Sequence, residues 1–374
     1  MAQRRRGRGE GSIYQRSDGR WCGALTIGAT ETGRPRRKVV YGRTRREVAE
    51  KLVELQTDPR GQQVSASPNL RLAEFMERWL ENDVRQSRRA TTVEGYERMV
   101  HDHINPRIGG IRLKALTSLN VEAWLADLGR SGLGASRRYR VFTVLRLAMR
   151  KAHAQKLIRD NPTDGVTPPN EVRREMQPLT VEQAERLIEC AKGRRYAALF
   201  SLALGTGLRW GELAGLRWAD IDLDSGFLHV QRIVVEARGR ILVHDPKTKA
   251  GRRRVAIPSF ALAALLEHRA RCAAPPHPTA WVFCNRHGGP LRKGNFHLEH
   301  WKPLRERAGV PAARFHDLRH TTASLLLKKG VHAKVIQAVL GHARFSVTMD
   351  LYSHLMDGMH EEAAEALEGI LGAS

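Results

Sequence analysis

Residues 314–352 open with Arg314-Phe315-His316-Asp317-Leu318-Arg319-His320, continue through Leu340-Gly341-His342 and end in Leu351-Tyr352. His316 and Arg319 are three residues apart, so their side chains share one face of a helical turn. Gly341 suits a left-handed helix cap, and His342 follows it directly. Such a polar set ending in a tyrosine predicts charge stabilisation beside a phenolic nucleophile.

Four charged side chains farther upstream extend this set. Arg209 follows Gly205-Thr206-Gly207 at the predicted start of a helix, where backbone N–H groups and a guanidinium favour an anion. Glu212 comes one turn later and is placed to orient its neighbours. Lys247 and Lys249 lie at a predicted hairpin tip, where a long ammonium side chain can reach into a groove.

The net charge of the chain indicates which kind of anion the site binds. The chain has 374 residues, enough for two or three domains, and carries 63 Lys and Arg against 39 Asp and Glu, a formal net charge of +24. This excess favours nucleic acid as the partner, and a solvated basic surface is the alternative. A membrane is disfavoured, because no apolar run is long enough to span one and no amphipathic anchor stands out.

The residue types in the set favour one kind of phosphoryl chemistry. No paired carboxylates stand out, and two-metal phosphoryl transfer needs them as ligands. Two arginine forks can neutralise a phosphoryl transition state without a metal, a tyrosine can attack the phosphorus, and a lysine can protonate the leaving oxygen. His316 and His320 have metal-ligand spacing, but no third ligand follows and Arg319 between them would repel a cation. The set predicts metal-free strand transfer.

Composition divides the chain at two polar stretches that contain proline. Residues 58–68 carry Gly, Pro, Ser and Gln, and residues 166–177 carry Pro168-Pro169 before a charged run. Domain boundaries fall in such linkers. The predicted parts are a basic arm (1–10), a small DNA-binding unit (11–57), a linker (58–68), a helical domain (69–165), a second linker (166–177) and a catalytic domain (178–374).

The predicted fold class is multidomain and mainly α. The small unit has strands at 11–14, 21–27 and 38–41 and a helix over 44–55 that opens with a capping box. Its basic sheet could enter a DNA groove, and a basic surface hairpin is the alternative. The helical domain has short helices with basic faces that could clamp a duplex, or it is a plain helical bundle.

The catalytic domain is predicted to be mixed α+β and mostly helical. Its predicted strands are three antiparallel ones at 227–235, 240–244 and 253–257 and a short one at 281–283, and its last helix covers 359–371.

Cysteine usage and the first residues predict the compartment. The cysteines form no CxxC pair, which fits a reduced, cytoplasmic protein; they are Cys22, Cys190, Cys272 and Cys284. Residues 1–8 are rich in arginine but no apolar region follows, so no signal peptide is predicted. For a protein that binds DNA, this implies a cytoplasmic, nucleoid-associated location.

The motifs resemble those of the tyrosine recombinase, or phage-type integrase, family. They are Gly207-Leu208-Arg209-Trp210-Gly211-Glu212-Leu213, the Lys-Thr-Lys hairpin at 247–249, His316-Asp317-Leu318-Arg319-His320, Leu340-Gly341-His342 and Tyr352. They occur in the family's order and spacing from about residue 178 to the C-terminus. More loosely, the helical domain resembles the family's core-binding domain and residues 11–57 resemble its arm-type DNA-binding domain.

The resemblance implies a role for each site residue. Arg209 and Arg319 would clamp the scissile phosphate, while His316 and His342 would hydrogen-bond its oxygens and assist proton transfer. Tyr352 would be the nucleophile that forms a 3′-phosphotyrosyl bond. A lysine would protonate the 5′-hydroxyl leaving group, and its spacing to Ile257-Pro258 favours Lys249 over Lys247.

The resemblance also implies partners. These are double-stranded DNA attachment sites, a homotetramer that exchanges strands through a Holliday junction, and an excisionase or a host DNA-bending protein, with no metal or nucleotide cofactor. The expected function is site-specific recombination that integrates or excises a phage or other mobile element. A type IB topoisomerase would share the chemistry, but it would not need an arm-like unit at 11–57. A non-catalytic DNA-binding regulator is the other alternative, and the six occupied positions argue against it.

Overall fold

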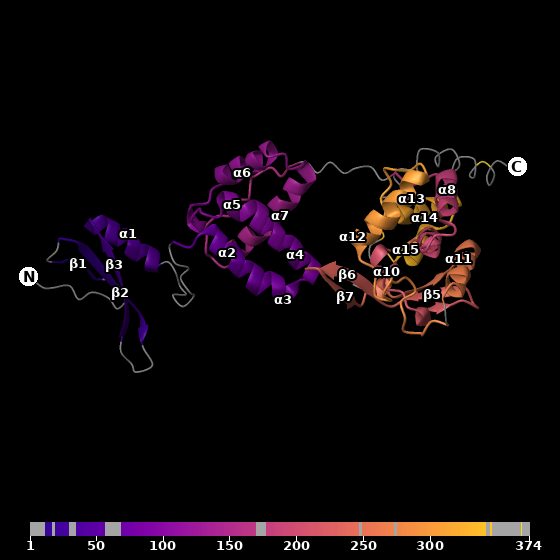
Figure 1. Cartoon of the computed structure of the whole chain (residues 1–374). Coiled ribbons are helices and arrows are strands. Elements are labelled where there is room, and N and C mark those ends of the chain that lie inside the picture. The colour runs from indigo at the N-terminus through magenta and orange to yellow at the C-terminus, as the bar shows by residue number, and fades with distance from the viewer. Residues whose placement is uncertain are drawn as a thin grey trace, which may run out of the picture. The chain divides into compact units, whose positions relative to one another are not determined.

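The structure is a computed structural model that describes residues 12–16, 19–29, 35–56, 69–169, 177–246, 249–272, 275–341, Phe345 and Glu368. Two compact units emerge from the contacts within the chain. One comprises residues 1–71 with the segments 111–116 and 151–161, and the other comprises residues 72–110, 117–150 and 162–374. Figure 1 shows the helices and strands of each part. Within the described ranges, no helix is both long enough and apolar enough to cross a membrane.

The N-terminal sheet and helix form as predicted. Strands β1 (Ser12–Gln15), β2 (Trp21–Ala29) and β3 (Pro35–Gly42) pair antiparallel in the order β1-β2-β3, and helix α1 (Arg45–Gln56) follows (Figure 1). The α1 residues Val48 and Leu52 are buried against the sheet. Gly23 of β2 permits this contact, because a Cβ there would lie 2.7 Å from both side chains.

The helical region consists of consecutive helices whose apolar faces point inward. They are α2 (Leu72–Trp79), α3 (Arg85–Ser87), α4 (Ala90–Met99), α5 (Asn105–Ile108), α6 (Ser118–Arg130) and α7 (Ala135–Ala154), with π-helical turns η1 (Leu80–Val84) and η2 (Val100–Ile104) and the 3₁₀ turn η3 (Leu113–Ala115). Thr117 and Asn120 form a capping box that starts α6. Pro106 occupies the first turn of α5, where a proline needs no N–H partner.

The C-terminal region, residues 177–341, is mainly helical around small sheets. Its helices are α8 (Val181–Ala191), α9 (Ala197–Thr206), α10 (Trp210–Leu213), α11 (Ser259–Ala270), α12 (Lys293–Phe296), α13 (Lys302–Arg307), α14 (Asp317–Lys328) and α15 (Ala333–Leu340), with η4 (Trp218–Asp220), η5 (Lys249–Gly251) and the π-helical turn η6 (His297–Trp301). Its core centres on buried aromatic and aliphatic side chains such as Phe200, Phe283 and Trp301.

The strands of this region pair differently from the prediction. The sheets are β4-β5-β8 and the hairpin β6-β7, formed by β4 (Ile221–Asp222), β5 (Phe227–Val230), β6 (Ile233–Ala237), β7 (Arg240–His244) and β8 (Arg253–Ala256). The single strand predicted over 227–235 therefore breaks at residues 231–232. There β6 turns to pack on α10, where Gly211 leaves room for the Val234 carbonyl, 2.7 Å from the position of a Cβ. The strand predicted at 281–283 is only an isolated bridge between Trp281 and Arg217.

Candidate active site

Gly207 ends α9 and brings three helices together. Its backbone is left-handed, with φ at 63°, which ends the helix within the Gly-Thr-Gly segment. A Cβ there would lie 2.5 Å from Leu340 Cδ2 and 3.4 Å from Thr322 Cβ, so α15 and α14 pack directly on this glycine. A residue with a side chain would displace the segment that leads into Arg209.

We expect Gly207→Ala to lower the free energy of unfolding by about 1–3 kcal/mol, because alanine adds both left-handed backbone strain and a clash with Leu340. Thermal or urea unfolding measures the change. Gly193→Ala is the matched control, since Gly193 is also left-handed, at φ 70°, but has no heavy atom within 4 Å of a Cβ. Equal losses in the two variants would contradict the packing role of Gly207.

Arg209 is held in place by Glu212. It is the N-cap residue of α10, and its backbone N–H donates to Glu212 Oε2 at 2.9 Å while its Nη1 donates to Glu212 Oε1 at 2.9 Å. The side chain of Glu212 is 3% exposed and that of Arg209 is 40% exposed. A buried carboxylate therefore orients an arginine that stays open to a ligand, as the sequence predicted.

Arg319, a residue of α14, reaches the same end of α15 as Arg209. Its Nη1 donates to the Gly207 carbonyl at 2.7 Å and its Nη2 to the Leu340 carbonyl at 2.6 Å. Arg209 donates to the Leu340 carbonyl through Nη1 at 3.5 Å and to the Gly341 carbonyl through Nη2 at 3.3 Å. Both guanidinium groups thus reach the C-terminal end of α15, whose carbonyls carry the negative end of the helix dipole.

The turn that carries Lys249 also lies beside the C-terminal end of α15. Gly341 caps α15 with a left-handed φ of 66°, and a Cβ there would lie 2.8 Å from the Ala250 carbonyl oxygen and 2.8 Å from Arg253 Nη1. The main chain of η5, residues 249–251, is therefore adjacent to Arg209 and α15. The Lys249 side chain and all of Lys247, His342 and Tyr352 lie outside the described residues.

The charges at the site favour an anion. Arg209, Arg319 and Arg253 face one carboxylate, Glu212, which leaves an excess of two positive charges. Burial alone would raise the pKa of Glu212, but hydrogen bonds and charges from Arg253 and Arg209 outweigh it and lower that pKa. Burial, with repulsion from Arg209, lowers the pKa of Arg319 to about 9, which still leaves the guanidinium charged at neutral pH.

His316 is neutral in the free protein at neutral pH. It precedes α14, and its ring meets that of His320 edge to face with centroids 4.8 Å apart. Although its surface reaches solvent, dense surrounding protein lowers the pKa of His316 to about 4, helped by His320, Arg319 and Arg209. A neutral imidazole can donate one hydrogen bond to a phosphate oxygen and accept a proton at its other nitrogen.

We expect the His316 imidazole to titrate near pH 4 in the free protein, well below the ordinary value of 6.5. As the pH falls from 6.5 towards 4, His316 becomes protonated in the unfolded chain but stays neutral in the folded protein. The free energy of unfolding therefore decreases in that window. A phosphate anion beside the ring should raise the pKa. NMR titration with and without a bound phosphodiester measures both values, and a free-protein midpoint at or above 6.5 would contradict the burial argument.

Among the described residues, the structure contains no group of three or more His, Cys, Asp or Glu side chains arranged to hold a metal ion.

Arg253 is a site residue that sequence reasoning missed. Its side chain is 7% exposed and pairs with Glu212. It is the first residue of β8 and the middle one of the run Arg252-Arg253-Arg254, and the arginines on either side of it are exposed. The alternation of a strand was the one signal that could have singled it out, because only every second residue faces the protein.

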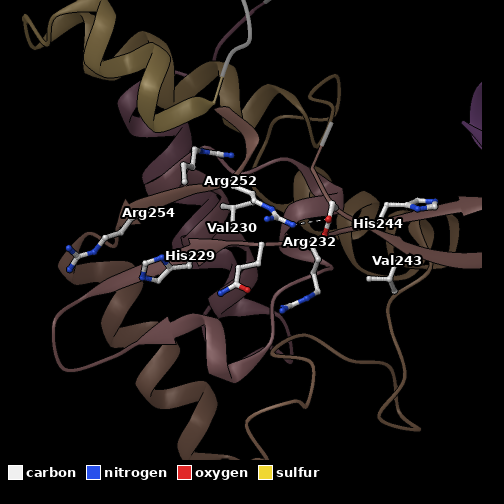
Figure 2. Close-up of a pocket in the computed structure, with 10 residues that line it drawn as sticks. His229, Val230, Arg232, Val243, His244, Arg252 and Arg254 are labelled. Atoms are coloured by element: carbon white, nitrogen blue, oxygen red, sulfur yellow. Dashed lines mark hydrogen bonds and ion pairs between the residues drawn. The ribbon is translucent and has the colours of Figure 1, made fainter. Parts of the chain in front are cut away.

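A separate cavity of about 570 Å³ lies beside the strands. It is lined by His229, Val230, Gln231, Arg232, Val243, His244, Asp245, Arg252, Arg253 and Arg254 (Figure 2). Its arginines already have partners: Arg232 pairs with Asp220, Arg252 with Asp245, and Arg254 lies over the Phe227 ring. Arg209, His316 and Arg319 are not among the lining residues, so this cavity is not the anion site.

The fold and the site together define a class of protein. A mainly helical domain brings two arginines and a neutral histidine to one cationic site, next to a turn that carries a lysine. These groups suit the stabilisation of a phosphodiester during transfer. The class is that of DNA strand-transfer enzymes.

Comparison with known proteins identifies the family. Residues 177–359 match the phage integrase family, and residues 71–129 match the phage integrase N-terminal SAM-like domain. A tyrosine recombinase XerC-like protein of Caldanaerobacter subterraneus subsp. tengcongensis is 30% identical over 372 residues, which cover 92% of this chain and 95% of the relative. The chain belongs to the tyrosine recombinase, or phage integrase, family, and the predicted family and enzyme class are confirmed.

Solved structures share the fold. The Tn1549 transposon integrase in complex with a circular intermediate DNA has a TM-score of 0.71 at 21% identity, covering 80% of this chain and 99% of that one. A lambda integrase tetramer bound to a Holliday junction has a TM-score of 0.57 at 19% identity, covering 89% and 95%. The predicted fold class is therefore confirmed.

Proposed function

We propose that this recombinase cuts and rejoins DNA at attachment sites with Tyr352 as nucleophile and Arg209, Arg319, His316, His342 and Lys249 as the groups that act on the phosphate. The observation that carries the proposal is the convergence of Arg209 and Arg319 on the Leu340 carbonyl, at 3.5 and 2.6 Å, beside the Lys249 turn. Two guanidiniums held this close can bind one phosphate together.

The proposed reaction exchanges one phosphodiester for another. The Tyr352 oxygen bonds to phosphorus and gives its proton to neutral His316 while the bond from phosphorus to the 5′ oxygen breaks. Lys249 gives that oxygen a proton, and the strand stays attached through a 3′-phosphotyrosyl bond. A 5′-hydroxyl of the partner strand then attacks the same phosphorus, and tyrosine leaves. Because the bond energy is conserved, the reaction needs no external energy source.

The guanidiniums of Arg209 and Arg319 act mainly on the transition state. Helix-end carbonyls and Glu212 fix both groups before DNA arrives, so little reorganisation is needed when charge develops on the phosphate oxygens. Neutral His316 can donate to one oxygen. His342 lies outside the described residues, but it directly follows Gly341 in the sequence, and we assign it to the same phosphate.

We assign double-stranded DNA as substrate, supported by the net charge of +24 and by the DNA-bound integrases that share the fold. A homotetramer is proposed from the lambda integrase tetramer on a Holliday junction. An excisionase, a host DNA-bending protein and association with the nucleoid complete the proposal. Mobile-element DNA with direct repeats at its ends would be the substrate.

Covalent trapping tests this function. The protein is incubated with a nicked duplex that carries the direct repeat flanking the element, so that the short 5′-hydroxyl fragment diffuses away after cleavage and the intermediate accumulates. We expect a covalent protein–DNA adduct on the strand with the new 3′ end. Absence of any adduct would overturn the proposal. Efficient relaxation of a supercoiled plasmid that lacks the repeat would favour topoisomerase activity instead.

A further inference from the structure

Arg253 joins three separate segments of the site through one guanidinium. Its Nε donates to the Val339 carbonyl at 2.6 Å, and its Nη1 donates to the Gly251 carbonyl at 3.3 Å. Nη1 and Nη2 also form a two-pronged pair with Glu212, at 3.2 and 3.0 Å. Few groups other than a planar guanidinium can serve these directions at once.

Each partner of Arg253 leads to a group in the proposed chemistry. Glu212 fixes the backbone and side chain of Arg209. Val339 directly precedes the Leu340 and Gly341 carbonyls that receive Arg319 and Arg209. Gly251 ends the turn that begins at Lys249. Arg253 therefore connects the lysine-bearing turn, residues 249–251, to the two arginines that face the phosphate.

A purely structural ion pair would account for only part of this arrangement. Burying Glu212 without a partner would be costly, and Arg253 lowers its pKa. That need would be met by the two bonds to the carboxylate alone. The bonds to the Gly251 and Val339 carbonyls add nothing to the charge of Glu212, but they fix the distance between the lysine turn and the end of α15.

We propose that Arg253 is a positioning residue that holds the Lys249 turn against Arg209 and Arg319, so that the proton donor and the phosphate clamp face the same phosphodiester. This inference rests on the proposed function. Misplacing a reacting group by about 1 Å can cost on the order of 100-fold in rate. The loss should fall on protonation of the leaving 5′ oxygen, because that is the step served by the lysine.

Arg253→Lys tests this role. The lysine ammonium keeps a positive charge for Glu212 but cannot also hold Gly251 and Val339 in place. Single-turnover cleavage is measured on the nicked duplex and on the same duplex with sulfur in place of the bridging 5′ oxygen. A thiol is far more acidic than an alcohol, with a pKa of about 8.5, so the thiolate leaves without needing a proton.

We expect Arg253→Lys to cleave the ordinary duplex about 100-fold more slowly than the unmodified chain and the sulfur duplex within about threefold of it. DNA affinity should stay within about threefold. Lys249→Ala should likewise cleave the ordinary duplex slowly and the sulfur duplex normally. If Lys247 is the proton donor, Lys247→Ala shows this behaviour instead. Arg252→Lys is the matched control, because Arg252 is adjacent to Arg253 but its own side chain is 63% exposed and pairs with Asp245.

Gly251→Ala tests the same turn without touching Glu212. A Cβ at Gly251 would lie 2.6 Å from Pro246 Cβ and would push the turn out of place. Rescue by sulfur in both variants supports the inference. An equal defect on oxygen and sulfur duplexes, or no defect in Arg253→Lys, overturns it. If the unmodified chain forms no adduct at all, the proposed function fails instead, so the two failures are distinguishable.

Discussion

Tyr352→Phe will abolish the covalent protein–DNA adduct and leave DNA affinity within about twofold of the unmodified chain. Phenylalanine keeps the aromatic ring but lacks the one oxygen that can bond to phosphorus. Arg209, Arg319 and the rest of the positive charge excess remain, so binding should persist. The measurement is a denaturing gel of the labelled nicked duplex, with affinity from a mobility shift.

Tyr196→Phe is the matched control for Tyr352→Phe. The Tyr196 hydroxyl donates to the Cys284 carbonyl at 2.9 Å, and its ring packs against Phe296 and His300 inside the catalytic region. Losing this hydroxyl should cost some stability and leave the adduct intact. If Tyr352→Phe formed as much adduct as the unmodified chain, another residue would be the nucleophile and the assignment of Tyr352 would be wrong.

The sequence could predict where Arg209, His316 and Arg319 stand in the fold because these residues sit in local patterns. The three-residue spacing of His316 and Arg319 put them at the start of one helix, and the Gly-Thr-Gly break placed Arg209 at another. Helix caps were also predictable, since Thr117 and Thr180 bond to residues only three positions away. In each case, the residues that decide the structure are close neighbours in sequence.

What the sequence could not predict depends on contacts between distant segments. Arg253 reads as one more residue in a basic run, and its role follows only from the position of Val339, 86 residues away. The break between β5 and β6 has the same cause. The run 227–235 is apolar enough for one strand, but the pairing of β5 with β8 and the packing of β6 on α10 divide it. Tertiary packing overrides strand propensity here.

Arg319→Ala will lower single-turnover cleavage by at least about 10²–10³-fold while DNA affinity changes no more than about threefold. The two bonds to the Gly207 and Leu340 carbonyls use two of the five N–H donors of the guanidinium, so others remain for the phosphate. These donors are fixed where charge develops, and their effect is therefore greatest in the transition state. Cleavage of the nicked duplex and a binding titration at one salt concentration measure the two effects separately.

Two further variants distinguish catalysis from folding and from charge. Arg319 is 3% exposed, so truncation also removes its bond to the Gly207 carbonyl and leaves the Leu340 carbonyl with only the longer bond from Arg209. Thermal unfolding must therefore accompany the assay. Arg319→Lys keeps the charge but cannot reach both carbonyls and a phosphate, and it should remain about as defective in cleavage as Arg319→Ala.

Arg159→Ala is the control for charge. It removes one positive charge from a side chain that is 96% exposed, and it should alter binding no more than Arg319→Ala does. If affinity fell in proportion to cleavage in Arg319→Ala, the arginine would bind ground state and transition state equally, and the division between many binding residues and two clamping arginines would be wrong.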